Sequence, residues 1–472
     1  MITTMRKTFR ETLALAVDDA RQGQQVIVSR TIPVPHINPL HFYAAAEDLY
    51  SGERTFWMSP NSDETMVGAG NEWIIDTAEQ SNARFTEIEI EWKRFKKYTD
   101  SADSDYKKGP ILMGGFSFDP LKNNNHLWKP YKEGRFVLPS FLCTWKKGQK
   151  PEITISKVIL PNETAEEAEA DFTKRTLYIK KLCRGKITAC STPAPFEMNE
   201  HHTEEWLASI SKATDSIRKG ELDKVVLARD ITLDSEKPID VQGALKTLIK
   251  EQQSSFRFIF ENGTSSFIGA TPERLVQIKD QHVRSACLAG TIKRGSSNKE
   301  DQMLESALLE DEKNLEEHAY VVKMIREALL NHCSDLHCPD GPGIYKTKNV
   351  QHLYTPIEGF LNKHSSLLDI VKHLHPTPAL GGLPQEKAMS MIRDIEPMDR
   401  GWYAAPIGWL DAEGNGEFAV AIRSSLVNEN SAVLYAGCGI VKDSDPEMEY
   451  EETKMKLRPM LSALGGLKYD RT

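Results

Sequence analysis

The stretch GWYAAPIGWLDAEGNGEFAVAIRSSLVNENSAVLYAGCGI, residues 401–440, decides the fold. Its apolar runs, at 402–410, 416–426 and 432–437, are separated by short polar segments that contain glycine, asparagine and acidic residues. Short apolar runs bounded by such residues are typical of β-strands joined by tight turns. Strands that follow one another directly favour an α+β fold with antiparallel sheet over a doubly wound α/β fold, in which helices alternate with strands.

The rest of the chain mixes further strands with helices. Further strands are predicted at 114–120, 136–145, 152–160, 224–230, 256–260, 266–270 and 275–278. Helices are predicted at 165–183, 203–219 and 303–331, and a last helix begins at 444 or 445. A polar segment that contains two prolines, 191–200, is the predicted linker between a first part, 1–195, and a second part, 196–472.

Composition and charge exclude several classes of protein. The chain has 472 residues and a formal net charge of −9 at pH 7, whereas a general nucleic-acid binder needs a basic surface to neutralise phosphates. No run approaches the roughly 20 apolar residues that span a bilayer, and residues 1–22 lack the apolar block of a secretory signal. Seven dispersed cysteines favour reduced thiols over a disulfide framework. We expect a cytoplasmic protein with no nucleic-acid and no membrane partner.

The final helix carries acidic residues in a pattern with two interpretations. Glu449 and Glu452 lie three residues apart and Lys456 follows four residues later, so the three share one helix face. They form either a solvated face with an ordinary Glu–Lys pair, or carboxylates that bind magnesium together with water and an anionic substrate.

Glu317 is a second candidate metal ligand. It lies on the predicted helix 303–331, and Tyr320, Val321 and Met324 follow it at helical spacing on the same side. A carboxylate beside an apolar stripe needs a cation or a metal as partner unless it reaches water at the edge of the helix. The sequence leaves both interpretations open.

Lys224 and Glu273 are candidate acid–base residues. Lys224 begins the apolar run 224–230 and is either an exposed strand end or, if buried, a lysine whose neutral form is favoured so that it can act as a base. Glu273 follows Pro272 between two predicted strands. It is either a surface turn residue or an acid held by a rigid turn.

The segment YAGCGIVK, 435–442, lies between a strand and a helix and invites comparison with a dinucleotide-binding loop. The third glycine of that fingerprint is replaced by Lys442, and no βαβ unit encloses the segment. Gly437 and Gly439 still allow backbone N–H groups to approach an anion closely.

Eight segments in chain order resemble the chorismate-utilising enzyme family, which includes isochorismate, salicylate, anthranilate and aminodeoxychorismate synthases. The segments are KVVLARD (224–230), ATPERL (270–275), LAGTIKRG (288–295), DEKNLEEH (311–318), LHPTPALGGLP (374–384), GWYAAPIGW (401–409), FAVAIRSSL (418–426) and YAGCGIVKDSDPEMEYEET (435–453). One such segment is weak, whereas eight in order are highly specific. The first part of the chain resembles the family only through GGFSFDP, 114–120.

The resemblance implies a fold and a set of ligands. The fold is a large α+β sandwich of two antiparallel sheets flanked by helices, with 1–195 as a structural part and 196–472 as the chorismate-binding catalytic region. Glu317 and Glu452 resemble ligands of Mg²⁺, which would hold the ring carboxylate of chorismate. The substrate-binding residues implied by the resemblance are Gly290, Thr291, His375, Ala379, Tyr403, Arg423, Gly437, Gly439, Glu449 and Lys456.

The resemblance also implies a reaction, the reversible conversion of chorismate to isochorismate by an isochorismate synthase. Members that add water have a lysine in the KVV segment and members that use ammonia lack it, so Lys224 resembles the base that activates water for attack at ring C2, and no glutaminase subunit is expected. Glu273 resembles the acid that protonates the departing C4 hydroxyl. Both groups must start uncharged, so their surroundings must favour the neutral forms.

Two positions bear on the alternatives. Members that go on to eliminate pyruvate tend to have threonine at the position of Ala379, which favours an isochorismate synthase over a salicylate synthase. Many members have an acid at the position of Asn314, so fewer acids surround the metal here. A catalytically silent chorismate-binding paralogue is a third interpretation. Four residues argue against it, namely Lys224, Glu273, Glu317 and Glu452.

Overall fold

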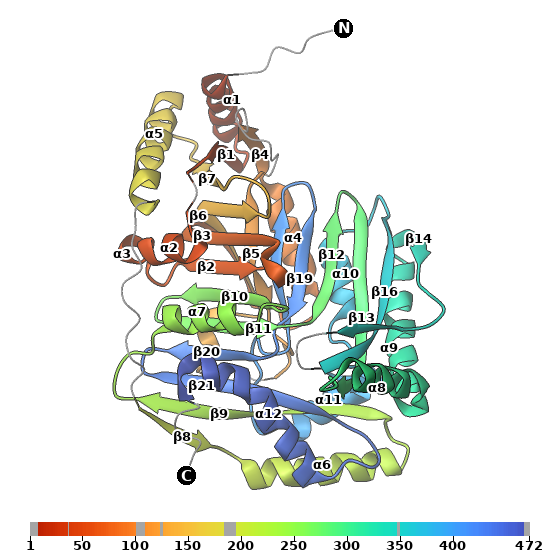
Figure 1. Cartoon of the computed structure of the whole chain (residues 1–472). Helices are drawn as coiled ribbons and strands as arrows, with labels where there is room; N and C mark the ends of the chain where they lie inside the picture. The colour runs from red at the N-terminus through yellow and green to blue at the C-terminus, as the bar shows by residue number, and fades with distance from the viewer. Residues whose placement is uncertain are drawn as a thin grey trace.

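The computed structural model describes residues 8–35, 37–100, 109–122, 126–183, 195–346 and 350–466. Its strands form one continuous hydrogen-bonded sheet, which separates into two layers (Figure 1). The first layer contains, in order of pairing, β9 (Lys224–Ser235), β21 (Ser431–Ile440), β20 (Ser424–Asn428), β11 (Ser265–Thr271), β10 (Phe256–Asn262), β2 (Arg54–Met58), β3 (Glu64–Thr77), β6 (Gly134–Lys146), β7 (Glu152–Ile159), β1 (Val26–Pro33) and β4 (Lys96–Asp100), with β8 (Phe196–Glu200) and β17 (Gly382–Leu383) beside β9. The second layer contains β5 (Ile111–Phe116), β18 (Pro406–Asp411), β19 (Gly416–Val420), β12 (Arg274–Lys279), β13 (His282–Lys293) and β16 (Val350–Leu361), with β14 (Cys333–His337) and β15 (Gly343–Lys346) beside β16.

Strand β6 joins the two layers. Its start, from Gly134 to Val137, pairs with β5 of the second layer, and its later part, from Phe141 to Thr144, pairs with β7 of the first. The strand pairs that build the site described below are antiparallel. The α+β fold with two antiparallel layers, expected from the run of strands at 401–440, is therefore confirmed, and the layers are continuous through one strand.

Two hydrophobic cores lie on opposite faces of the first layer. Phe258 and Phe260 of β10 belong to a core that also contains Trp402 and residues of the second layer, whereas Ile259 between them belongs to a core shared with outer helices. This alternation is the two-residue period of a strand covered on both faces.

Helices cover both cores. Those on the outer face of the first layer are α1 (Phe9–Arg21), α2 (Pro39–Ala45), α5 (Ala165–Leu182), α7 (Val241–Glu251) and α12 (Pro446–Leu464). Those that contribute to the core shared by the two layers are α4 (Ala83–Arg94), α6 (Thr203–Arg218), α9 (Glu312–Leu330), α10 (Leu367–Leu374) and α11 (Gln385–Ile395). The short α3 (Glu47–Tyr50) follows α2, and α8 (Asn298–Glu310) packs on β13 and β16.

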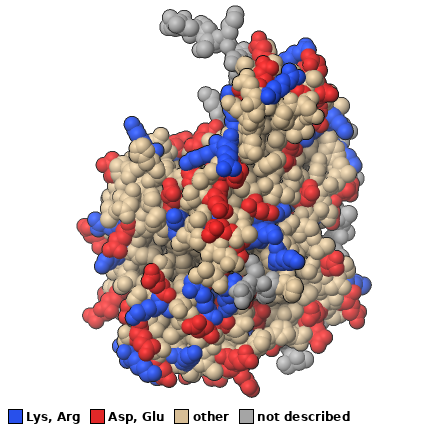
Figure 2. Space-filling view, turned by 180° about the vertical axis from the view of Figure 1, so that it is seen from behind, with Lys and Arg blue, Asp and Glu red and all other residues tan. Residues whose placement is uncertain are grey.

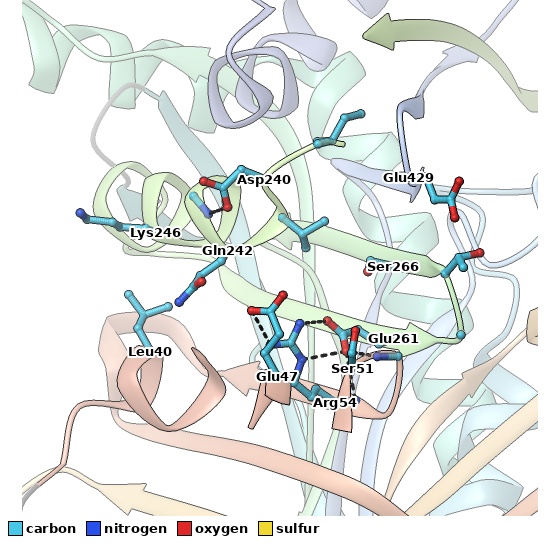
Figure 3. Close-up of a pocket in the computed structure, with 16 residues that line it drawn as sticks. Leu40, Glu47, Ser51, Arg54, Asp240, Gln242, Lys246, Glu261, Ser266 and Glu429 are labelled. Carbon is cyan, nitrogen blue, oxygen red and sulfur yellow. Dashed lines mark hydrogen bonds and ion pairs between the residues drawn. The ribbon is translucent and has the colours of Figure 1, made fainter. Parts of the chain in front are cut away.

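A buried arginine–glutamate pair ties the first part of the chain to the second (Figure 3). Arg54 of β2 donates from Nε and Nη2 to the two carboxylate oxygens of Glu261 of β10, at 2.9 and 2.7 Å. The hydroxyl of Tyr43 donates to the same carboxylate at 2.5 Å. Parts 1–195 and 196–472 thus share one sheet and one set of buried contacts.

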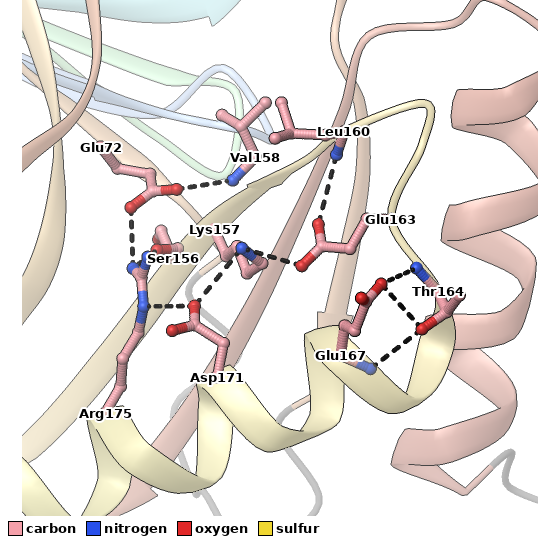
Figure 4. Close-up of polar contacts among 10 residues, drawn as sticks. All are labelled: Glu72, Ser156, Lys157, Val158, Leu160, Glu163, Thr164, Glu167, Asp171 and Arg175. Atoms are coloured by element: carbon pink, nitrogen blue, oxygen red, sulfur yellow. Dashed lines mark hydrogen bonds and ion pairs between the residues drawn. The ribbon is translucent and has the colours of Figure 1, made fainter.

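Helix α5 is held on the sheet by a second group of ion pairs (Figure 4). Arg175 of α5 contacts Glu72 of β3 at 2.7 Å and Asp171, one turn away, at 2.8 Å. Lys157 of β7 contacts Glu163 at 3.1 Å and Asp171 at 3.4 Å. These contacts orient the helix at the edge of the molecule that contains β1, β4 and β7.

Three segments predicted from the sequence have other boundaries in the structure. The predicted single helix 303–331 is wrong, because Asp311 ends α8 and its side chain accepts a hydrogen bond from the backbone N–H of Asn314 as the N-cap of α9. The predicted strand 416–426 is interrupted at Arg423, whose φ of +53° is incompatible with a strand. In the predicted linker 191–200, residues 191–194 lie outside the described residues and Phe196–Glu200 forms β8, so the linker prediction is wrong there.

The surface gives no sign of a basic face on the side seen in Figure 2, where acidic and basic side chains are interspersed. Among the residues that the structure describes, no helix is long and apolar enough to cross a membrane.

Candidate active site

Lys224 is placed at the edge of the sheet, where β9 begins and pairs with β17. Its side chain is only 14% exposed, and Nζ lies 2.6 Å from Oε1 of Glu317. The lysine side chain lies over Gly439 of β21, where an added Cβ would come within 2.8 Å of Lys224 Cε. Glycine at 439 therefore leaves the space that the lysine occupies.

His318 fixes the helix that presents Glu317. The imidazole is buried, donates from Nδ1 to the carbonyl of Ala289 at 3.2 Å and accepts at Nε2 from the hydroxyl of Thr355 at 2.8 Å. Burial lowers the pKa of His318, which favours the neutral ring that this pattern of one donor and one acceptor requires. Because β13 and β16 supply both partners, α9 is held with Glu317 facing Lys224.

Glu273 lies in the turn between β11 and β12. Its backbone N–H donates to the hydroxyl of Thr271 at 3.3 Å, and its carbonyl accepts from the backbone of Val420 at 3.0 Å. Burial raises the pKa of Glu273 to about 7, against the lowering effect of the nearby Lys224 cation. The protonated acid is therefore well populated near neutral pH, as the expected role requires.

The buried thiol of Cys287 shows that these groups surround one place. Burial raises the pKa of Cys287, and the carboxylates of Glu273 and Glu317 raise it further while Lys224 lowers it. The Sγ atom of Cys287 also lies 3.5 Å from Nδ1 of His318, the residue that follows Glu317. The thiol therefore lies near the Lys224–Glu317 pair, and Glu273 interacts electrostatically with both.

Gly290 and Thr291 continue the site along β13. Gly290 has a φ of +78°, and an added Cβ would lie 3.1 Å from the Oδ1 atom of Asn314, so both the backbone and the close approach of α9 require glycine. The hydroxyl of Thr291 lies 2.8 Å from Nδ1 of His352 on β16.

Arg423 interacts electrostatically with His352 on β16 and with Glu452 on α12. Burial lowers the pKa of its guanidinium, while Tyr403 and the carboxylate of Glu452 raise it. The Arg423 charge in turn adds to the effect of burial in lowering the pKa of His352. Tyr403 is buried and stacks on Tyr435, with ring centroids 5.2 Å apart.

Helix α12 supplies the remaining charged residues of the site. Lys456 contacts Glu452 at 2.5 Å and donates to the carbonyl of Gly437 at 2.9 Å. Glu449 accepts a hydrogen bond from Ser444 at 2.7 Å and faces the same side, whereas Glu451 is exposed. The prediction that Glu449, Glu452 and Lys456 share one face is confirmed.

Contacts and electrostatic interactions together run in a ring, which we call the site ring. It passes from Lys224 to Glu317, across Asn314, Gly290 and Thr291 to His352, through Arg423 to Glu452 and Lys456, and back along β21 from Gly437 to Gly439. The steps from His352 to Arg423 and from Arg423 to Glu452 are electrostatic, and the other steps follow contacts or the course of α9, β13 and β21. Residues 437 and 439 are two apart on a strand, about 7 Å. The two lysine–glutamate pairs consequently meet β21 close to each other.

A protein-family model described as "Chorismate binding enzyme" matches residues 11–465. The chain belongs to this family. The isochorismate synthase MenF of Bacillus subtilis (strain 168) is 43% identical over 472 residues, which cover 99% of each protein. The salicylate biosynthesis isochorismate synthase of Pseudomonas aeruginosa is 34% identical over 465 residues, 97% of this chain and 95% of that protein.

A solved structure supports the same placement in the family of chorismate binding enzymes. The structure of MenF, the menaquinone-specific isochorismate synthase from Escherichia coli, is 26% identical to this chain. It superposes with a TM-score of 0.77 and covers 96% of this chain and 100% of that one.

The donor set of the site ring fits magnesium. Glu317 and Glu452 bring carboxylate oxygens from two helices, and magnesium is commonly bound by one or two carboxylates together with water and substrate. No group of three or more His, Cys, Asp or Glu side chains within the described residues is arranged to hold a metal ion. A magnesium site formed by Glu317 and Glu452 would have to be completed by substrate and water.

The imidazole of His375 makes its polar contact outside the site ring. His375 is buried and donates from Nε2 to the carbonyl of Phe118 at 2.9 Å, and burial lowers its pKa to about 3. Ala379 packs against the core shared by the layers, three residues before β17 pairs with β9. No contact among the described residues brings His375 to the site ring.

The structure also adds residues that the motifs did not single out. His352 lies on β16, where inward and outward residues alternate along the strand, and that alternation was the available signal in the sequence. His318 lay within a quoted motif without an assigned role. Cys287 was recognised only as one of the dispersed cysteines.

Proposed function

We propose that this member of the family is an isochorismate synthase, which adds water to chorismate at C2 and releases the C4 hydroxyl. The observation that carries the proposal is the placement of Lys224 and Glu273 around one place, with the pKa of Glu273 raised to about 7. The two relatives that match nearly the whole chain carry isochorismate synthase in their names, which supports the same activity.

The reaction needs a base and an acid at opposite ends of a shift of ring double bonds. Lys224, an ammonium in its ion pair with Glu317, must first give up its proton. Its neutral amine then takes a proton from water as the water oxygen bonds to C2. The C4–O bond breaks, and protonated Glu273 gives its proton to the departing hydroxyl, which leaves as water. No atom is gained or lost overall, so the reaction is an isomerisation and can run in both directions.

The remaining members of the site ring bind the substrate. Arg423 and Lys456 supply positive charge for carboxylates, and Tyr403 supplies a hydroxyl, while the backbone N–H groups near Gly437 and Gly439 can approach an anion. Gly290 and Thr291 line the ring of the substrate. Arginine and lysine recognise carboxylates through charge-assisted hydrogen bonds.

Magnesium would be held by Glu317 and Glu452, with Glu449 beside them. When bound, it would supply a positive charge that holds the ring carboxylate of chorismate. The chain presents these carboxylates from α9 and α12, each paired with a lysine, Lys224 or Lys456.

The product is expected to be isochorismate and not salicylate, because Ala379 stands where enzymes that eliminate pyruvate tend to have threonine. No glutaminase subunit is expected, because the lysine of water-using members is present as Lys224. The test is to incubate the purified chain with chorismate and Mg²⁺ and to resolve the products by liquid chromatography. Isochorismate without pyruvate is the expected result. Salicylate with equimolar pyruvate, or chorismate binding without turnover, would contradict the proposal.

A further inference from the structure

A cavity of about 580 Å³ lies at the N-terminal end of α4, between that helix, the residues after β5 and the end of α10. We call it the α4 cavity. Arg84, Phe118, Lys372, Pro376 and Met389 are among the residues that line it. None of its lining residues belongs to the site ring, so it is a separate place on the protein.

Arg84 is a buried cation that forms no ion pair with a carboxylate of the described residues. Its residue is 1% exposed, and its Nη1 and Nη2 atoms donate to the backbone carbonyls of Ser81 and Ser117 at 3.2 and 3.3 Å. Within the described residues, its Nε has no hydrogen-bond partner. Burial lowers the pKa of Arg84 to about 10, with Glu133 and Asp119 acting only at longer range. A buried charge of this kind is costly unless an anion pairs with it.

The acidic residues that line the cavity, Asp119 and Glu386, do not pair with Arg84. Asp119 is engaged by Arg393 at 2.6 Å. Glu386 is exposed at the margin of the cavity. Lys372 is half-buried, and no ion pair involves it within the part of the chain that the structure describes. Positive charge therefore exceeds negative charge at the inner end.

The N-terminus of α4 adds to this positive end. Asn82 occupies the N-cap position without a side-chain cap hydrogen bond, although the hydroxyl of Ser81 accepts from the N–H of Ala83 at 3.0 Å. The N–H of Arg84 donates to the carbonyl of Ser81 at 3.2 Å, so the first two N–H groups of α4 are engaged, and it is the helix dipole that favours an anion at this position. Phe118, Pro376 and Met389 give the lining of the cavity apolar and aromatic surface.

We propose that the α4 cavity binds a small organic carboxylate. The carboxylate pairs with Arg84 and Lys372 beside the N-terminus of α4, and the apolar body of the ligand packs against Phe118, Pro376 and Met389. The ligand class follows from two features of the lining. A carboxylate complements the Nε–H of Arg84, which has no partner among the described residues, and the ammonium of Lys372, and an organic body buries the apolar side chains.

The test is isothermal titration of the full chain with benzoate, benzamide and inorganic phosphate. Saturable 1:1 binding of benzoate is expected, with benzamide weaker by about 10-fold or more, since hydrogen bonds to charged groups contribute about 1.5–3 kcal/mol. Equal binding of benzamide would overturn the role of charge. Phosphate binding tighter than benzoate would overturn the organic ligand in favour of a simple oxyanion site.

Single-residue variants test whether benzoate binds in the α4 cavity. Lys372→Gln should weaken benzoate binding several-fold, and the matched exposed lysine variant Lys363→Gln should leave it unchanged. Arg84→Gln should weaken it further, and Lys372→Gln keeps the test decisive if Arg84→Gln does not fold. Arg423→Gln should leave benzoate binding intact, because Arg423 belongs to the site ring. Loss of binding in Arg423→Gln alone would place benzoate in the site ring and overturn the proposal, independently of whether the chain makes isochorismate.

Discussion

Buried arginine–glutamate pairs and partly exposed lysine–glutamate pairs differ in this molecule. The first kind belongs to the scaffold and the second to the site ring. Arg54–Glu261 and Arg400–Glu396 are buried, with side chains 8% and 4% exposed in the first and 3% and 0% in the second. Lys224–Glu317 and Lys456–Glu452 lie at the surface of the site ring, where the glutamates are 40% and 44% exposed.

The arginine pairs are fixed by additional hydrogen bonds. Arg400 donates to both carboxylate oxygens of Glu396 and to the carbonyls of Val226 and Leu380, and Glu396 also accepts from the backbone of Ala228. On this side of β9, Val226 and Ala228 therefore bond to the Arg400–Glu396 pair instead of to a neighbouring strand. Both residues lie close to Lys224 along β9. In each lysine pair the carboxylate is held by one ion-pair contact, although Lys456 also donates to the carbonyl of Gly437. Glu317 and Glu452 can therefore exchange a lysine for another cation.

Among the residues of these ion pairs, Lys224 is expected to affect the rate of catalysis most when it is replaced. Lys224→Ala should lower the rate of isochorismate formation by about 10²–10⁴-fold, the usual contribution of a positioned base. The unfolding free energy should change by less than about 1 kcal/mol, because the lost ion pair is half-exposed. Product chromatography and urea denaturation measure the two quantities. Undiminished turnover would remove Lys224 as the base.

The arginine pair should show the opposite pattern, with stability as the main loss. Arg400→Met should lower the free energy of unfolding by about 3–5 kcal/mol, because Glu396 is left as an unpaired buried charge. The double variant Arg400→Met/Glu396→Leu should recover part of this loss, since no charge then remains buried. A single-variant loss below about 1 kcal/mol in urea denaturation would contradict the distinction between the two kinds of pair.

Glu452 should affect the metal requirement. Glu452→Gln should raise the Mg²⁺ concentration for half-maximal rate by about tenfold or more, since even residues that only orient a ligand contribute about 10–100-fold to metal affinity. The measurement is the rate as a function of Mg²⁺ at saturating chorismate, with thermal melting as the control for folding. An unchanged Mg²⁺ dependence would exclude Glu452 as a ligand.

Glu273 should couple stability to pH. Its pKa of about 7 exceeds the ordinary 4.5, so the folded protein keeps a proton that the unfolded chain releases between these values. The stability that this group contributes is complete below pH 4.5 and is lost as the pH rises through 7. Glu273→Gln should therefore abolish activity yet raise the unfolding free energy by about 1–2 kcal/mol at pH 8, with a smaller gain at pH 5. A larger gain at pH 5 would reverse the sign and exclude the raised pKa.

The smallest effect is expected at an exposed pair on the same helix as Lys456. Lys454 and Glu451 lie 2.9 Å apart, with side chains 44% and 66% exposed. Lys454→Ala should change the unfolding free energy by less than about 0.5 kcal/mol and leave the rate unchanged. It serves as the matched control for Lys456→Ala, which should weaken chorismate binding as a rise in KM.

The sequence predicted most of what depends on local pattern. The runs of antiparallel strands and the shared face of Glu449, Glu452 and Lys456 follow from spacing alone. The division of 303–331 at Asp311 depended on a side-chain cap that competes with helix continuation, and the break at Arg423 depended on a left-handed residue within an apolar run. Neither feature changes the hydrophobic period, so periodicity could not reveal them.

The site was predictable where motifs carried it and not where tertiary packing did. His352 joins the site ring only because β16 pairs with β13 and brings it to Thr291. His375 lay within a motif, yet its imidazole is directed to the carbonyl of Phe118. Direction of a side chain is set by the surrounding fold, which a motif does not record.

The most direct test of the proposed water addition is the reaction in H₂¹⁸O. The chain is incubated with chorismate and Mg²⁺, and the isochorismate formed is analysed by mass spectrometry. One ¹⁸O atom in the new hydroxyl at C2 is predicted, because Lys224 activates water from solvent and the C4 oxygen leaves. Isochorismate that retains the original oxygen, without ¹⁸O, would contradict the account.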